Sequence, residues 1–178
     1  MLRSRTLAVG CVILGAAGCG SLERPTAAVP TPQRPSVSSS QPSVSAATFV
    51  AENGSIELFV IRSSELALQR SSSPRVREFA QRMIADHKGT SGQLSLEGRR
   101  LNLLPSATLA TNEQTMLDGL QMSGQFDADY VRDERAVHQR LVAMDTVYAA
   151  SGGSPTLKPV ASAALPIEQR HLRLIAYL

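Results

Sequence analysis

Residues 74–101 read PRVREFAQRMIADHKGTSGQLSLEGRRL, and this stretch decides the fold. Its apolar residues and one histidine recur at intervals of three and four, which places them on one face of a helix. The stripe consists of Val76, Phe79, Ala80, Met83, Ile84, His87, Leu94 and Leu101. Ser73 can cap the free amides before it, and Pro74 fits the first helical position. The stretch therefore predicts a long amphipathic helix with one buried face.

The same periodicity continues on both sides of this helix. It predicts further helices over residues 47–70, 112–122, 126–151 and 155–177. Pro105 lies in a connecting loop, and Gly152 and Gly153 end the fourth segment, as glycines beyond a helix do. Four main helices and one short extra helix predict an all-α four-helix bundle over residues 47–178. In the last segment, Pro159 fits an early turn, whereas Pro166 is expected to kink the helix.

Composition agrees with helix-on-helix packing. Hydrophobic residues make up 43% of the chain, but aromatic residues make up only 4% and tryptophan is absent. A core of Leu, Ile, Val, Ala and Met suits a helical bundle better than a β-sandwich, where aromatic and β-branched residues are enriched.

The first 18 residues have the pattern of a bacterial export signal. Two arginines precede an apolar run that is too short to span a bilayer, and small residues follow it. Residues 16–19, Ala-Ala-Gly-Cys, resemble the lipobox of bacterial lipoproteins, in which the cysteine is acylated. We therefore expect a signal peptide over 1–18 and a lipid anchor on Cys19. The alternative is ordinary cleavage nearby, with Cys19 left unmodified.

A tether is predicted between the anchor and the bundle, over residues 19–46. Five of the ten prolines lie here, among Ser, Thr, Ala, Val and Gln. Such a segment buries too little apolar area to offset the entropy of ordering, and proline keeps it extended. The tether is expected to be disordered and to hold the domain away from the membrane.

Charge and cysteine content exclude several functions. Removing Arg3 and Arg5 with the signal leaves 16 basic and 15 acidic residues, without a basic cluster, so we expect no nucleic-acid partner. Cys11 leaves with the signal, and acylation of Cys19 leaves no free thiol for thiolate chemistry. A glycine-rich phosphate loop and a Gly-x-Ser-x-Gly elbow are both missing from the sequence. Nothing indicates a catalytic residue.

The residues that can carry chemistry are three histidines and nearby carboxylates, each on or beside an apolar stripe. The candidates for metal ligation are Glu57, His87, His138 and His171, with Asp86, Tyr130, Glu134 and Glu168 as supporting residues. Imidazole and carboxylate groups presented by facing helices are what a metal site in a bundle requires. A structural hydrogen-bond network is the competing interpretation, in which a carboxylate or Tyr130 fixes each histidine tautomer.

Residues 77–87, with the pattern Phe-Ala-x-x-Met-x-x-Asp-His, resemble the bacterial family called domain of unknown function 4142. Leu104-Pro105, Phe126-Asp127-x-x-Tyr130, His138 and Leu165-Pro166 before His171 extend the resemblance over most of the mature chain. The resemblance implies a ferritin-like fold and an exported envelope protein. It also implies functional positions at Glu57, Asp86, His87, Tyr130, His138 and His171.

The sequence thus favours a non-enzymatic envelope lipoprotein with a ferritin-like domain, anchored to a membrane through Cys19. Gly20 after Cys19 favours the outer membrane, facing the periplasm, by analogy with other lipoproteins. The alternative function is a metal-binding redox or storage protein that holds one or two ions of iron, manganese or zinc through interior histidine and glutamate residues.

Overall fold

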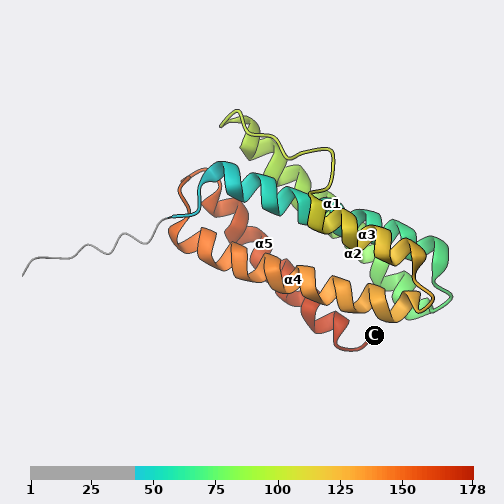
Figure 1. The fold of residues 1–178 in the computed structure, drawn as a ribbon. Helices are drawn as coiled ribbons and strands as arrows, with labels where there is room; N and C mark the ends of the chain where they lie inside the picture. Colours follow the sequence, from blue (N-terminus) through green and yellow to red (C-terminus); the bar gives the residue numbers. More distant parts are fainter. Residues whose placement is uncertain (1–42) are drawn as a thin grey trace, which may run out of the picture. The chain divides into compact units, whose positions relative to one another are not determined.

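The computed structural model describes residues 43–178, and they form five helices with no strand among them (Figure 1). The helices are α1 (Ala46–Arg70), α2 (Pro74–Arg99), α3 (Thr111–Met122), α4 (Phe126–Ser151) and α5 (Lys158–Ile175). The all-α prediction is confirmed. Cys19, the export signal and most of the predicted tether lie outside the described residues. None of the described helices is long and apolar enough to cross a membrane.

The starts of α1 and α2 follow capping serines in the sequence. The Ser45 hydroxyl accepts a hydrogen bond from the Thr48 amide at 3.1 Å, so α1 begins one residue before the expected position. Ser73 caps α2 in the same way, and Pro74 occupies its first turn. An N-cap bond of this kind stabilises a helix by about 1 kcal/mol.

Four helices, α1, α2, α4 and α5, form the bundle (Figure 1). Phe49 near the start of α1 stacks on Tyr148 near the end of α4, with ring centroids 3.8 Å apart, so these two helices are antiparallel. Phe79 in α2 meets Tyr130 in α4, and both residues lie near the starts of their helices, so α2 and α4 run the same way. A bundle with one such long crossover between its second and third main helices has the ferritin-like topology.

The short helix α3 belongs to the crossover and packs against α1 and α4. Arg70 at the end of α1 donates to the carbonyls of Leu120 and Ser123 at 2.6 and 2.7 Å, which satisfies the free end of α3. The loop between α2 and α3 contains Pro105 and packs closely against Gly54 of α1. A side chain at Gly54 would place its Cβ 2.6 Å from the Cβ of Pro105, so glycine permits this close approach.

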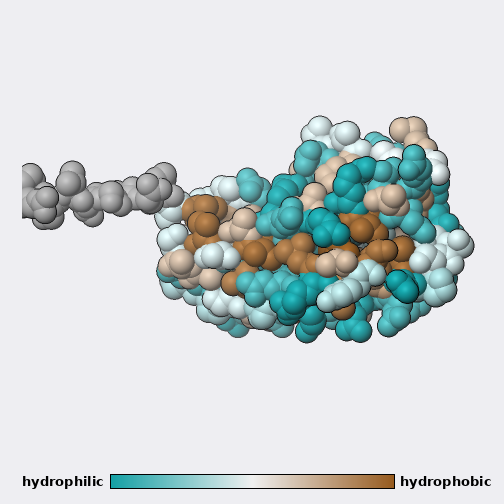
Figure 2. Space-filling model, turned by 90° about the horizontal axis from the view of Figure 1, so that it is seen from below, coloured by the Kyte–Doolittle hydropathy of each residue, from teal (hydrophilic) through white to brown (hydrophobic). Residues whose placement is uncertain are grey.

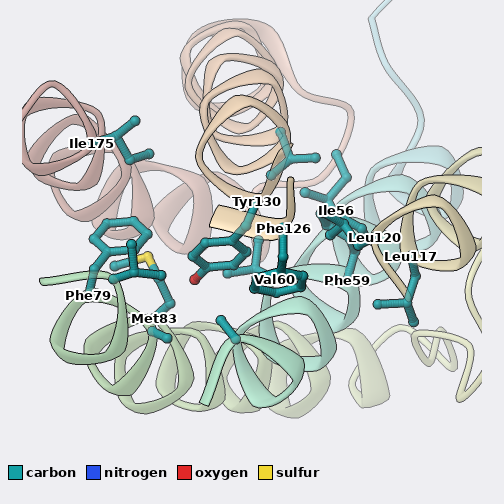
Figure 3. Close-up of a cluster of buried hydrophobic side chains, with 14 of the residues drawn as sticks. Ile56, Phe59, Val60, Phe79, Met83, Leu117, Leu120, Phe126, Tyr130 and Ile175 are labelled. Atoms are coloured by element: carbon teal, nitrogen blue, oxygen red, sulfur yellow. The ribbon is translucent and has the colours of Figure 1, made fainter. Parts of the chain in front are cut away.

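The buried apolar residues form two clusters. The larger contains Ile56, Phe59, Met83, Leu120 and Tyr130, drawn in Figure 3. The smaller contains Phe49, Leu94, Tyr148, Leu157 and Ala161. Along α2 the first cluster ends at Met83 and the second begins at Leu94, so the stretch between them is left for polar groups.

The last helix differs from the prediction at its ends. Residues 155–157 form a turn, and α5 begins at Lys158 with Pro159 in its first turn, where the missing amide needs no partner. The helix continues through Pro166. Proline leaves the carbonyl four residues earlier without its helical donor. That residue is Ser162, which is exposed, so water can take the place of the donor.

The surface of the bundle is amphipathic. Figure 2 shows a face on which hydrophobic residues form a band along the bundle, with hydrophilic residues on both sides.

Candidate metal centre

Four side-chain donor atoms from three helices converge between the two apolar clusters. They belong to His87 on α2, His138 on α4, and Glu168 and His171 on α5. The Nε2 atom of His138 lies 3.2 Å from Nε2 of His87 and 3.2 Å from Nδ1 of His171. The Oε2 atom of Glu168 lies 3.6 to 3.7 Å from these three nitrogens. All four side chains are 0% exposed.

Helical periodicity brings these residues inward. On α5 the buried residues are Ala161, Ala164, Glu168, His171 and Ile175, which follow one another at intervals of three and four. On α2, His87 follows Met83 by one turn and continues the buried stripe. The site is therefore built on rigid helices within the core rather than on loops.

In each histidine, the ring nitrogen that faces away from the other donors, here called the outer nitrogen, donates a hydrogen bond to a nearby acceptor. His87 Nδ1 donates to Glu57 Oε2 at 2.9 Å, and His171 Nε2 donates to Asp86 Oδ2 at 2.9 Å. His138 Nδ1 donates to the backbone carbonyl of Glu134 at 2.7 Å. These acceptors assign a proton to each outer nitrogen, so a ring that is neutral presents the lone pair of its inner nitrogen to the other donors.

The acceptors are themselves held in place. The Thr90 hydroxyl donates to Glu57 Oε2 at 2.7 Å, and Arg170 donates to Asp86 Oδ2 at 3.1 Å. Outer hydrogen bonds of this kind orient imidazole ligands in metalloproteins and raise their basicity.

The centre is strongly charged for a buried site. Burial and the neighbouring His87 lower the pKa of His138 to about 3, so this ring is neutral. Burial also lowers the pKa of His87, but the carboxylates of Glu57 and Glu168 outweigh it and raise the value to about 9. Burial raises the pKa of Glu168, but the imidazoles of His171, His87 and His138 bring it below its ordinary value. The metal-free centre therefore holds a proton on His87 and a negative charge on Glu168.

One proton cannot satisfy this arrangement. The proton on His87 Nε2 can form a hydrogen bond to the lone pair of His138 Nε2. The contact between His138 Nε2 and His171 Nδ1 then has no proton, so two acceptors face each other there. Both carboxylate oxygens of Glu168 lack a hydrogen-bond partner among the described residues. An unpaired buried acceptor costs about 1–3 kcal/mol, and more when it is charged. A purely structural network therefore leaves several acceptors facing one another.

A metal ion satisfies all four donors at once. Zinc binds imidazole nitrogen and carboxylate oxygen at about 2.0–2.2 Å in tetrahedral geometry, which places the ligands about 3.3–3.6 Å from one another. Five of the six separations between the four donor atoms span 3.2 to 3.7 Å, and all six lie within 4.8 Å. Three neutral imidazoles and one carboxylate also form a donor set typical of zinc and copper(II).

Two further buried acids lie near the four donors. Burial raises the pKa of Glu134 to about 8, and its Oε1 atom accepts a hydrogen bond from Ser63 at 2.6 Å. Burial and the charges of Glu168 and Glu57 raise the pKa of Asp145 to about 8. Its Oδ1 atom accepts from Asn53 at 3.1 Å. The raised pKa values favour the protonated form of both acids at neutral pH, which limits the negative charge in the core.

The structure places the residues singled out in the sequence in three groups. His87, His138 and His171 meet at the centre with Glu168, which had been expected only to support it. Glu57, Asp86 and Glu134 supply the outer acceptors. Tyr130 lies apart from the histidines, and its hydroxyl is hydrogen-bonded to Ser64 at 2.8 Å.

Sequence reasoning missed four polar residues around the centre, namely Asn53, Ser63, Thr90 and Asp145. The spacing of these residues gives a signal for all four. Asn53 precedes Glu57 by four residues and Asp145 follows His138 by seven, so each continues the stripe of a recognised candidate. Ser63 follows Val60 by three residues and Thr90 follows His87 by three, so both also continue a stripe, but this signal is weak because both residue types are common on any helix face.

The comparisons with known proteins give a family and a fold. Residues 31–178 match the family model described as "Domain of unknown function (DUF4142)". No curated protein matches the chain.

Among solved structures, "CopM in the Cu(II)-bound form" is similar with a TM-score of 0.64 and 16% identity, over 76% of this chain and 95% of that one. "Crystal structure of DUF305 fragment from Deinococcus radiodurans" has a TM-score of 0.64 and 16% identity, over 74% and 92%. "CopM in the apo form" has a TM-score of 0.61 and 16% identity, over 75% and 94%. At 16% identity these structures show that the chain has a similar fold.

Proposed function

The chain belongs to the DUF4142 family, and we propose that its bundle domain binds one transition-metal ion through His87, His138, His171 and Glu168. One observation carries the proposal. Four buried donor atoms lie within 4.8 Å of one another, and five of their six separations are 3.2 to 3.7 Å, while the opposite nitrogen of each histidine is already engaged. This is the arrangement that orients imidazoles toward a metal.

The donor set favours zinc or copper(II). Manganese prefers oxygen ligands, and non-haem iron centres of oxygenases use two histidines and one carboxylate with open positions. Copper(II) forms the more stable complexes of the two favoured ions, and a protein of similar fold is described in a Cu(II)-bound form. Among the metals expected from the sequence, zinc fits best.

Four protein ligands also favour binding over catalysis. Catalytic zinc sites keep a position for water beside three protein ligands, whereas structural sites are closed by four. Here the fourth position is supplied by Glu168, and every ligand is fully buried. The proposed role is therefore to hold or store a metal ion rather than to activate a substrate.

Metal analysis tests this role directly. The whole chain is purified from cells without chelators or a histidine tag, and its metal content is measured by mass spectrometry. We expect about one equivalent in the wild type and none in the His138→Ala variant. Tyr130→Phe is the matched control, because it removes a buried hydroxyl of the same bundle that contacts Ser64 and no ligand. A metal-free wild-type protein, or equal content in His138→Ala, would reject the site.

The proposed location is the cell envelope, with the domain tethered through an acylated Cys19. The support is the sequence of the first 19 residues and Gly20, which favours the outer membrane. Labelled palmitate should enter the wild-type protein and fail to enter Cys19→Ala. Equal labelling of the two proteins, or none in either, would contradict the anchor.

A further inference from the structure

A groove of about 750 Å³ runs between α2 and α5. One wall comes from α2 and includes Ala85, Gly89 and Thr90, and the facing wall comes from α5 and includes Pro159, Ala163 and Ile167. The small side chains on both helices leave the groove open. Its volume lies in the range of small-ligand sites, so it far exceeds what one ion needs.

The groove reaches the outer hydrogen-bond partners of the metal centre. Asp86 lines it, and Asp86 Oδ2 lies 2.9 Å from Nε2 of His171. Thr90 also lines it and bonds to Glu57, which accepts from His87. The ligands are 0% exposed, but the side chain of Asp86 is 27% exposed. Asp86 is therefore the one residue that separates solvent in the groove from His171, a proposed metal ligand.

We propose that this groove is the port through which the metal ion reaches and leaves the buried centre. The inference rests on the proposed metal site. Asp86 offers the arriving cation a partly exposed carboxylate beside His171. Its partner Arg170 is bound to it at 3.1 Å near the surface, where an ion pair is weak and easily opened.

Gly89 supports this assignment. It lies in the middle of α2, where glycine is less favourable than alanine. Packing does not require it, since a Cβ at this position meets no atom of the described chain within 4 Å. The missing side chain instead leaves room in the groove one turn away from Asp86.

The test is to fill the groove and measure the rate of metal exchange. Whole-chain protein is loaded with zinc, and the release of zinc to an excess of a coloured chelator is followed, as is its uptake by the metal-free protein. Gly89→Leu should slow both rates tenfold or more and keep one zinc per chain. The matched control is Gly92→Leu on the same helix, which also meets nothing within 4 Å but does not line the groove. It should exchange zinc at the wild-type rate.

Ala163→Leu narrows the groove from the opposite wall and should slow exchange as well. Circular dichroism and denaturant unfolding test whether the variants retain the fold, and leucine at a helical glycine should not weaken α2. Wild-type rates in both Gly89→Leu and Ala163→Leu, with zinc still bound, would overturn the port and leave the metal site intact. A wild-type protein that binds no zinc would overturn the metal site itself, and the port with it.

Discussion

The Nε2 atoms of His87 and His138 lie 3.2 Å apart, and both side chains are completely buried. Two ring nitrogens at this distance must share a proton or a cation, because two lone pairs repel. The proton held by His87 can bridge its own contact with His138. His171 and Glu168 also lie against His138, and no further proton is available for these contacts. This surplus of acceptors is the physical reason for assigning a metal to the centre.

Metal binding should stabilise the fold. A ligand that binds only the folded state stabilises it by about 2.7 kcal/mol at 100 times its Kd, which corresponds to a rise in Tm on the order of 10 °C for a domain of this size. We expect this rise when zinc is added to the chelator-treated wild type, measured by calorimetry. His138→Ala should show no rise, and an equal rise in that variant would point to binding elsewhere.

The two carboxylates near His87 should differ in their effect on affinity. Glu168 faces the three nitrogens, so Glu168→Gln removes an anionic ligand and should abolish stoichiometric binding. Glu57 acts through the His87 ring, so Glu57→Gln should keep one zinc and weaken its affinity about 10–100-fold, as expected for an outer partner. A competition titration against a coloured chelator measures both. Equal losses in the two variants would argue against the assigned roles.

The metal-free protein should lose stability as pH rises. The pKa values of Asp145 and Glu134 are raised to about 8 from ordinary values of 3.8 and 4.5. Between the ordinary and the raised pKa values, the folded state keeps protons that the unfolded state has released. The contribution of these two acids to the free energy of unfolding is therefore present in acid and is lost as pH rises through about 8. Urea unfolding of chelator-treated protein at pH 5 and pH 9 should show the loss.

Asp145→Asn should reduce this pH dependence, because an amide keeps the shape of the carboxyl group and does not ionise. The control is Asp118→Asn, which changes an exposed acid on α3 and should leave the pH dependence as in the wild type. If Asp145→Asn lost as much stability between pH 5 and pH 9 as the wild type, Asp145 would not contribute to the pH dependence.

Gly54 and Gly119 should respond to alanine with opposite signs. Both lie in helices, where alanine is favoured over glycine by about 1 kcal/mol. At Gly119 a Cβ meets no atom of the described chain within 4 Å, so Gly119→Ala should stabilise the protein. At Gly54 a Cβ lies 2.6 Å from the rigid ring of Pro105, and such overpacking costs about 1–3 kcal/mol. Denaturant unfolding measures both changes, and a stabilised Gly54→Ala would contradict the tight approach of the loop.

The bundle could be predicted from the sequence because the residues that begin and end each helix agree with the apolar stripe that packs in the core. The Ser73-Pro74 start and the stripe through Phe79 and Met83 fixed the position of α2 to within two residues of its end. The end of α4 followed from Gly152 in the same way. The start of α5 was placed three residues early, because a proline such as Pro155 suits a turn as well as a helix.

The roles within the centre were harder to predict. Spacing shows that Glu168 and His171 share a helix face, but it does not fix how far α5 slides along α2. That axial offset decides that Glu168, rather than Glu57, lies against the inner nitrogens. Asp145 escaped notice for a similar reason, since its nearness to Glu57 depends on how α1 and α4 are paired.

X-ray absorption at the zinc edge of protein loaded with one equivalent of zinc tests the central claim most directly. The account predicts four nitrogen or oxygen ligands at about 2.0–2.1 Å, with the outer-shell scattering of three imidazoles. A shell of six oxygens, a sulfur ligand, fewer than three imidazoles, or zinc that is lost on simple dialysis would contradict it.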